Sequence, residues 1–297
     1  MLEELGFEFS PKQYTLFFAQ KNKLSVVVYE KGPKILVQGK GVEEFVQFEL
    51  EPKIFGEAKL GYEEVHSPEM FEPHFGVDES GKGDFFGPLV IAGVYVDRGI
   101  ARKLMDAPVQ DSKRISSDAR IRSLADVIRK NTQGLIEVVL IGPAKYNELY
   151  DKFGNLNKLL AWGHARVIEN LLAKKPDCPR SLSDQFADAR VIEESLLRHG
   201  RKIDIQQRPR AESDIAVAAA SILAREAFIN WLDREGKKLG IRLERGVSAG
   251  VKAAAEKLVE ANGPEILYRV AKIHFRTAHA IAPAHFAEPP ARQNWRK

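Results

Sequence analysis

The sequence predicts an α/β domain with one mixed sheet flanked by helices, preceded by a small α+β unit. From Phe75 onward, apolar runs typical of strands alternate with segments of helical periodicity. Residues 1–65 instead contain short β-type runs around a glycine–proline turn. Residues 66–74 contain two prolines and little periodicity. We therefore expect an N-terminal domain at 1–65, a linker at 66–74 and a large domain at 75–297.

The N-terminal unit is predicted to be built around a β-hairpin. A helix-like opening precedes strands expected at 23–29 and 34–39, which are joined by a tight turn. Six lysines and one acidic residue, Glu30, lie between positions 12 and 40, so the hairpin side is locally basic. Lysines also protect sheet edges from pairing with other chains, and charge alone does not separate that role from polyanion binding.

The segment 66–74 is predicted to be a linker because its two prolines interrupt any regular periodicity. It contains His66 and His74. We expect both to be ordinary linker residues, since no third ligand stands at a spacing suited to a metal site.

The stretch from Phe75 to Val96 is the most informative part of the chain. Two carboxylates, Asp78 and Glu79, end one strand-like run, and a second run rich in β-branched residues begins at Leu89. The glycines and proline between the runs exclude a helix and force a tight turn. Acidic residues are poor strand formers, so a pair of them at a strand end is a local conflict typical of a functional site.

Several kinds of ligand could bind at this turn, and the glycine spacing excludes some of them. The glycines place bare backbone N–H groups beside the carboxylates, an arrangement that receives phosphate. The spacing fits neither the dinucleotide-binding fingerprint nor a P-loop. Acids beside backbone donors suggest a divalent metal and a phosphodiester. A solvated turn or a helix cap is the alternative for the pair Asp78 and Glu79.

Further along, the alternation of helices and strands continues. A helix is expected to begin near Ser117, followed by a strand at 135–141 and an apolar helical stripe from Leu156 to Leu171. Trp162 and His164 lie beside this stripe, and we expect them to pack rather than to bind a ligand.

Two further carboxylates stand at comparable positions. Asp184 ends a strand predicted at 180–184, which repeats the strand-end placement of Asp78. Glu212 stands at the start of an alanine-rich helix. Helix capping alone would explain Glu212 or its neighbour Asp214, because the dipole favours acids in a first turn.

Composition sets limits on the class of protein. The 297 residues are 44% hydrophobic and 29% charged, as in an ordinary globular protein, and the net charge of +4 permits a polyanionic partner without demanding one. Cys178 is the single cysteine, which excludes an internal disulfide and a cysteine zinc site and fits a reducing cytoplasm. We expect no secretory leader and no membrane span, since no run approaches the ~18 apolar residues required.

The pattern Asp78-Glu79-x-Gly81-Lys82-Gly83, with Gly87-Pro88-Leu89-Val90 after it, resembles the signature of the type 2 ribonucleases H. Further matching motifs follow in the family's order at 111–113, 153–165, 184–186 and 211–225. Asp184-Gln185-Phe186 and Ala211-Glu212-Ser213 place the resemblance in the ribonuclease HIII branch rather than the HII branch. The resemblance spans essentially the whole chain.

The resemblance implies a ribonuclease H-like fold for 75–297 and, for 1–65, a substrate-binding domain similar to the TATA-box-binding protein. It implies a metal-dependent endonuclease that hydrolyses the RNA strand of RNA/DNA hybrids, leaving 5′-phosphate and 3′-hydroxyl ends. We expect no obligate protein partner and a monomer. The implied catalytic residues, which would hold two Mg2+ or Mn2+ ions, are Asp78, Glu79, Asp184 and Glu212. The implied substrate contacts are Gly81, Lys82 and Gly83. Asp188 and Asp214 are nearby alternatives to Asp184 and Glu212 as catalytic acids, and the resemblance disfavours both.

Two other functions stay open on the residues alone, namely a non-catalytic hybrid-binding protein and a two-metal nuclease acting on branched or duplex DNA. Successive strand residues face opposite sides, so Asp78 and Glu79 both reach the metals only if the chain bends at Ser80-Gly81. Basic residues that could hold phosphates, or simply be solvated, lie at 198–202 and 208–210 and at Arg269, Lys272, His274 and Arg276.

Overall fold

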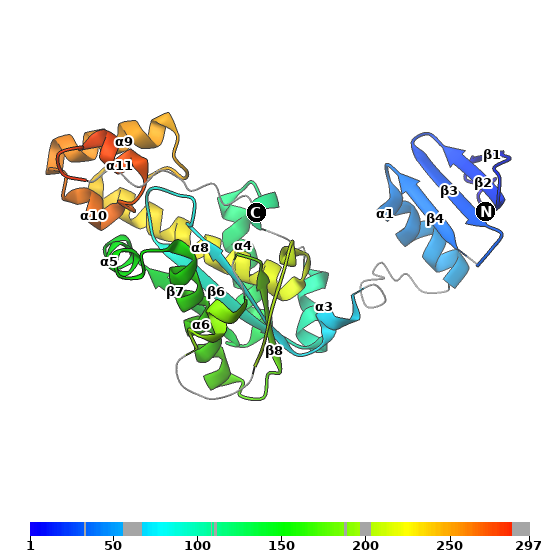
Figure 1. The fold of residues 1–297 in the computed structure, drawn as a ribbon. Helices are drawn as coiled ribbons and strands as arrows, with labels where there is room; N and C mark the ends of the chain where they lie inside the picture. Colours follow the sequence, from blue (N-terminus) through cyan, green and yellow to red (C-terminus); the bar gives the residue numbers. More distant parts are fainter. Residues whose placement is uncertain are drawn as a thin grey trace. The chain divides into compact units, whose positions relative to one another are not determined.

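The structure is a computed structural model of the chain. It describes residues 1–32, 34–55, 67–107, 109, 112–186, 189–196 and 203–286. The chain divides into two compact units, Met1–Ser67 and Pro68–Lys297, coloured blue and cyan to red in Figure 1. Each unit has its own hydrophobic core.

The first unit is a four-stranded antiparallel sheet with strand order β1-β2-β3-β4. The strands are β1 (Glu8–Ser10), β2 (Thr15–Lys21), β3 (Leu24–Tyr29) and β4 (Ile35–Gly39), followed by the short helix α1 (Val42–Phe45) and the π-helical segment η1 (Val46–Phe55). The predicted hairpin is confirmed as β3 and β4, which pair from Leu24 with Gly39 to Val28 with Ile35. The predicted helical opening is wrong, because the chain forms turns there and then enters β1.

The second unit contains the mixed sheet that the sequence predicts, with strand order β7-β6-β5-β8-β9. Its strands are β5 (His74–Ser80), β6 (Leu89–Val96), β7 (Ile136–Ile141), β8 (Arg180–Asp184) and β9 (Asp204–Arg208). The pairs β5–β6 and β6–β7 are antiparallel, whereas β5–β8 and β8–β9 are parallel. The central strand β5 therefore lies between β6 and β8.

The helices of the second unit are α3 (Arg98–Asp106), α4 (Asp118–Thr132), α5 (Pro143–Phe153), α6 (Leu156–Lys174), α7 (Ala189–Glu193), α8 (Ile215–Leu239), α9 (Ala249–Asn262), α10 (Ile266–Val270) and α11 (Arg276–Ile281). The 3-10 turns among the described residues of this unit are η2 (Pro68–Phe71), η3 (Ser112–Arg114) and η4 (Ala211–Ser213). The helix predicted to begin near Ser117 is confirmed as α4, since the Ser117 hydroxyl accepts a hydrogen bond from the N–H of Arg120.

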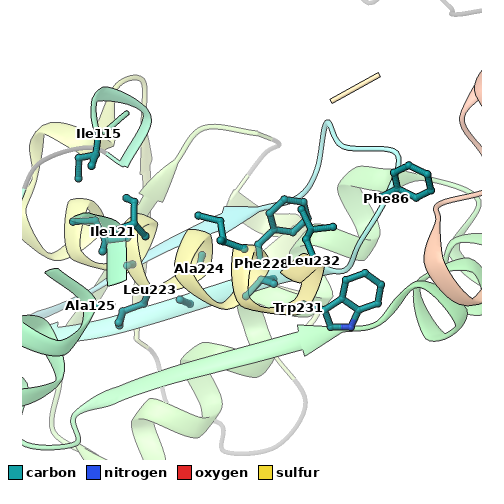
Figure 2. Packing of buried hydrophobic residues seen from close by; sticks show 14 of the residues in the cluster. Phe86, Ile115, Ile121, Ala125, Leu223, Ala224, Phe228, Trp231 and Leu232 are labelled. Atoms are coloured by element: carbon teal, nitrogen blue, oxygen red, sulfur yellow. The ribbon is translucent and has the colours of Figure 1, made fainter. Parts of the chain in front are cut away.

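Helices α6 and α8 pack on opposite faces of the sheet. A Cβ added to Gly76 of β5 would lie 2.3 Å from the backbone of α8 at Ala216 and Val217, so this glycine lets the helix lie directly on the strand. Leu223, Ala224 and Phe228 continue the contact along α8 (Figure 2). Among the described helices, α8 is long and apolar enough to cross a membrane, but 83% of that stretch is buried inside the protein, as in a core helix.

The predicted linker at 66–74 differs from the structure. Residues 68–71 form η2, and its Met70 and Phe71 are buried in the core of the second unit. His74 is the first residue of β5 and is fully buried. Residues 68–74 thus belong to the second unit because their apolar side chains complete its core, whereas His66 lies outside the described residues.

Candidate active site

Asp78 and Asp184 are brought together by two neighbouring parallel strands. Val77 of β5 is in register with Ser183 of β8, so the next residue along each strand is an aspartate. Side chains two apart on a strand share a face. Asp78 therefore lies on the same face as Gly76, which contacts α8, and Asp184 on the same face as Leu182, which packs against Val217 of α8.

Glu212 is carried to this face by the turn before α8. Asp184 Oδ1 accepts a hydrogen bond of 2.9 Å from the N–H of Ala211, which fixes η4 against the end of β8. The Oε2 atom of Glu212 is buried and has no hydrogen-bond partner. A buried carboxylate oxygen without a donor is an oxygen ligand ready for a hard cation, so the donor set fits Mg2+ or Mn2+.

The side chain of Glu79 projects from the face of β5 opposite to that of Asp78. The ladder between β5 and β6 is regular through Ser80 and Val90, so no bulge brings Glu79 to the side of Asp78. Its Oε2 lies 3.2 Å from Nε2 of His164 on α6, and its Oε1 lies 3.5 Å from Nζ of Lys82. The bend expected at Ser80-Gly81 comes after this pair, at Gly81, where φ is +89°.

The two adjacent acids differ in their proton affinity. Burial, followed by the charge of Glu79, raises the pKa of Asp78 well above its ordinary value, and the charge of Asp184 adds to this. Burial also acts to raise the pKa of Glu79, but the hydrogen bond from His164 and the charges of His164 and Lys82 outweigh it and lower that pKa. A divalent cation would favour the charged form of every acid here.

The four acids stand on β5, β8 and η4, and their side chains do not surround a single point. Within the described part of the chain, no three His, Cys, Asp or Glu side chains are already grouped so as to hold a metal ion. Strand alternation keeps Glu79 out of such a group, because it puts Asp78 and Asp184 on one face and Glu79 on the other.

The glycine-rich turn that follows β5 leaves open space beside the acids. A Cβ at Gly81 would lie 2.2 Å from the carbonyl oxygen of Pro88, whereas at Gly83 it would meet no atom within 4 Å. Gly83 is exposed, and the side chain of Lys82 is 40% exposed. The turn can therefore be approached from solvent at Lys82 and Gly83.

Lys272 supports this turn from inside, so both alternatives considered for it, a phosphate contact and a solvated side chain, are wrong. The side chain is fully buried, and its Nζ donates to the carbonyl oxygens of Gly87 at 2.6 Å and Asp84 at 3.0 Å. His274 is also largely inside, with its ring stacked on Tyr150 at 4.2 Å between centroids. Neither side chain is placed to hold a substrate phosphate.

Sequence reasoning missed the roles of two buried histidines. His164 was expected to serve packing, yet it contacts Glu79. His74 was expected in a linker, yet its Nε2 lies 3.0 Å from Asp214, which is the N-cap of α8 and accepts from the N–H groups of Ala216 and Val217. Asp214 is thus engaged as a cap, while Asp188, Asp111 and 198–202 lie outside the described residues.

Comparison with known proteins shows similarity over most of the chain. The family model described as Ribonuclease HII matches residues 75–278. Ribonuclease HIII of Chlamydia caviae is 44% identical over 282 residues, covering 94% of this chain and 91% of that protein. Ribonuclease HIII of Protochlamydia amoebophila is 44% identical over 280 residues, with the same coverage. The crystal structure of Bst-RNase HIII in complex with Mn2+ matches with a TM-score of 0.68 at 28% identity, covering 95% of each chain.

Proposed function

The chain belongs to the ribonuclease HII family, and we propose that four acids carry its activity. It is a metal-dependent ribonuclease of the HIII type, which cleaves the RNA strand of RNA/DNA hybrids. The acids are Asp78, Glu79, Asp184 and Glu212. The observation that carries the proposal is the register of β5 and β8, which sets Asp78 beside Asp184 and, through Ala211, beside the turn of Glu212.

Two divalent ions, Mg2+ or Mn2+, supply an activated water and charge stabilisation at the leaving 3′ oxygen in this class of chemistry. The part of the chain is to present oxygen ligands at a strand end. Asp78 and Asp184 are the most direct ligands in this proposal, since rigid neighbouring strands hold them on one face. Glu212 adds its unpartnered oxygen from η4. Glu79 is proposed to complete the set around the end of β5, since its charge acts on Asp78 although the two side chains leave opposite faces of the strand.

Substrate selection is proposed to take place at the glycine-rich turn. A hybrid duplex displays 2′-hydroxyls in a wide minor groove, and these distinguish RNA from DNA. Gly83 leaves its backbone open, and Lys82 can turn its ammonium group from Glu79 to a phosphate. Gly81 shapes the turn, because its positive φ of +89° suits glycine.

We further propose that the protein acts as a monomer in the cytoplasm and that residues 1–65 help to hold the substrate. The lysines between positions 12 and 40 support the last point, since phosphate contacts dominate nucleic-acid affinity. The single cysteine, which is buried, is compatible with a reducing compartment.

The experiment is a cleavage panel. The full chain is incubated with a labelled RNA/DNA hybrid, matched DNA and RNA duplexes, and a DNA duplex with one embedded ribonucleotide, each with and without Mg2+. Metal-dependent cutting of the RNA strand of the hybrid, with 5′-phosphate ends, is expected. Cutting of the all-DNA duplex would indicate the DNA nuclease alternative, and tight hybrid binding without turnover would indicate the binding protein.

A further inference from the structure

Both carboxylate oxygens of Glu79 are held by other side chains, but by partners of different character. Lys82 reaches Oε1 at 3.5 Å from a side chain that is 40% exposed, so substrate or solvent can draw it away. His164 reaches Oε2 at 3.2 Å from a side chain that is 1% exposed. His164 is therefore the fixed partner of this acid.

Among the described residues, His164 makes one side-chain hydrogen bond, to Glu79. A carboxylate can only accept, so the Nε2 atom must donate to Glu79. The other ring nitrogen, Nδ1, is buried and has no hydrogen-bond partner. Its ring packs against Phe186 with 4.7 Å between centroids, and Phe186 stands two residues after Asp184. Burying an imidazole with one nitrogen that lacks a hydrogen-bond partner costs free energy. The hydrogen bond from Nε2 to Glu79 offsets part of this cost.

The position of Glu79 explains why such a bond is needed. Asp78 and Asp184 are set by the sheet register on the α8 face, but Glu79 leaves β5 on the α6 face. A glutamate has three side-chain torsions, and without a fixed donor its carboxylate would sample several orientations at the end of the strand. Helix α6 supplies that donor.

We propose that His164 is a positioning residue that holds the carboxylate of Glu79 in the orientation in which it ligates a divalent cation. This inference rests on the proposed metal site. Hydrogen-bond partners of metal-ligating groups fix the geometry of those ligands, and losing one weakens metal affinity or activity by about 10- to 100-fold.

The test measures Mn2+ binding to the full chain by isothermal titration calorimetry without substrate. We expect His164→Leu, which fills similar space without a donor, to weaken Mn2+ binding by about 10- to 100-fold. His164→Gln can place an N–H near the lost Nε2 and is expected to recover much of the affinity, whereas the shorter His164→Asn is not. The KM for hybrid at saturating metal is expected to change little in all three variants.

Leu172→Ala, about two turns further along α6 and also buried, controls for loosening of the helix and is expected to leave Mn2+ affinity unchanged. If His164→Leu does not fold, the Gln and Asn pair still decides, because the two amides differ only in reach. Wild-type affinity in His164→Leu, or equal affinity in Gln and Asn, would overturn the inference. Asp78→Asn distinguishes the two failures: if it too leaves Mn2+ binding intact, the metal site itself is misassigned.

Discussion

Gly81 and Gly83 stand two positions apart in one turn, yet they meet different demands. Gly81 has a positive φ and no space for a Cβ, whereas Gly83 has open space beside it. The first glycine is therefore required by the fold, and the second is available to a ligand.

Gly81→Ala is expected to destabilise the protein by about 1–3 kcal/mol or more, from the strained backbone and the contact with Pro88. Gly83→Ala is expected to unfold like the wild type but to raise the KM for hybrid, because its methyl group occupies the approach to the backbone. Urea unfolding and steady-state kinetics measure the two effects. Equal losses of stability would contradict the distinction between these glycines.

The buried ammonium group of Lys272 is expected to make the stability of the protein depend on pH. Burial lowers the pKa of its ammonium group to about 7, against the opposing effect of Asp84. Between that value and the ordinary lysine pKa, the unfolded chain binds a proton that the folded chain does not. The free energy of unfolding should therefore rise with pH over this window and lose this contribution as pH falls toward 7.

We expect the wild type to gain about 2 kcal/mol more than Lys272→Met between pH 7 and pH 9. The variant removes the titrating group but keeps most of the length of the side chain, so charged groups that do not interact with Lys272 cancel in the comparison. Urea unfolding at several pH values measures the two slopes. Parallel slopes would mean that the carbonyl oxygens of Asp84 and Gly87 keep the ammonium group charged in the folded protein.

At the scale of secondary-structure elements, a buried pair joins the central strand to the core helix. His74 begins β5, and Asp214 caps α8; both side chains are fully buried. The other ring nitrogen of His74 lies 2.7 Å from the carbonyl oxygen of Glu72, so both ring nitrogens have a partner. The pair thus connects the two elements that flank the proposed metal site.

Asp214→Ala is expected to cost about 2–4 kcal/mol, because it removes a cap and leaves a buried ring nitrogen of His74 without its partner. Ser248→Ala, which removes the exposed cap of α9, is expected to cost about 1 kcal/mol and serves as the control. Chemical denaturation measures both. Similar costs for the two variants would show that Asp214 acts as a cap alone.

The elements predicted correctly were those with strong local signals. Runs rich in valine and isoleucine marked β3, β6 and β7, and helical periodicity marked α4 and α6. The strands β1 and β2 were missed, because the short run Leu16-Phe17-Phe18-Ala19 lacks alternation and does not separate strand from helix.

In the candidate site, too, positions with a local sequence signal were predictable and tertiary contacts were not. The placement of Asp78 and Asp184 at strand ends was predictable, because each follows a run typical of a strand. The roles of His164, His74 and Lys272 were not, because their partners stand 85, 140 and 185 positions away in the chain. Such contacts depend on tertiary packing, which local periodicity does not encode.

At the scale of the whole molecule, the two units carry separate cores and different charge patterns. The sheet of the first unit is stabilised by Phe7, Ala19, Val26 and Phe45, independently of the core around α8. Its six lysines between positions 12 and 40 belong to a unit without any of the four proposed catalytic acids. Binding and cleavage are therefore expected to be separable.

Residues 68–297 alone are expected to fold and to cleave hybrid with a kcat near that of the full chain. The KM should rise by about tenfold or more, because a tethered binding module is lost, and its salt dependence should weaken as phosphate contacts disappear. Steady-state kinetics at several salt concentrations measure both. An unchanged KM would remove the first unit from substrate binding.

The proposed metal site is tested by comparing aspartates at the two ends of the sheet. Asp184→Asn removes a proposed metal ligand, while Asp97→Asn changes the residue after β6, at the opposite end, where it caps α3. With Mg2+ and hybrid, Asp184→Asn should lose several kcal/mol of transition-state stabilisation, or about a hundredfold or more in rate, while still binding hybrid. Asp97→Asn should cleave like the wild type. Full cleavage by Asp184→Asn would contradict the proposed metal site.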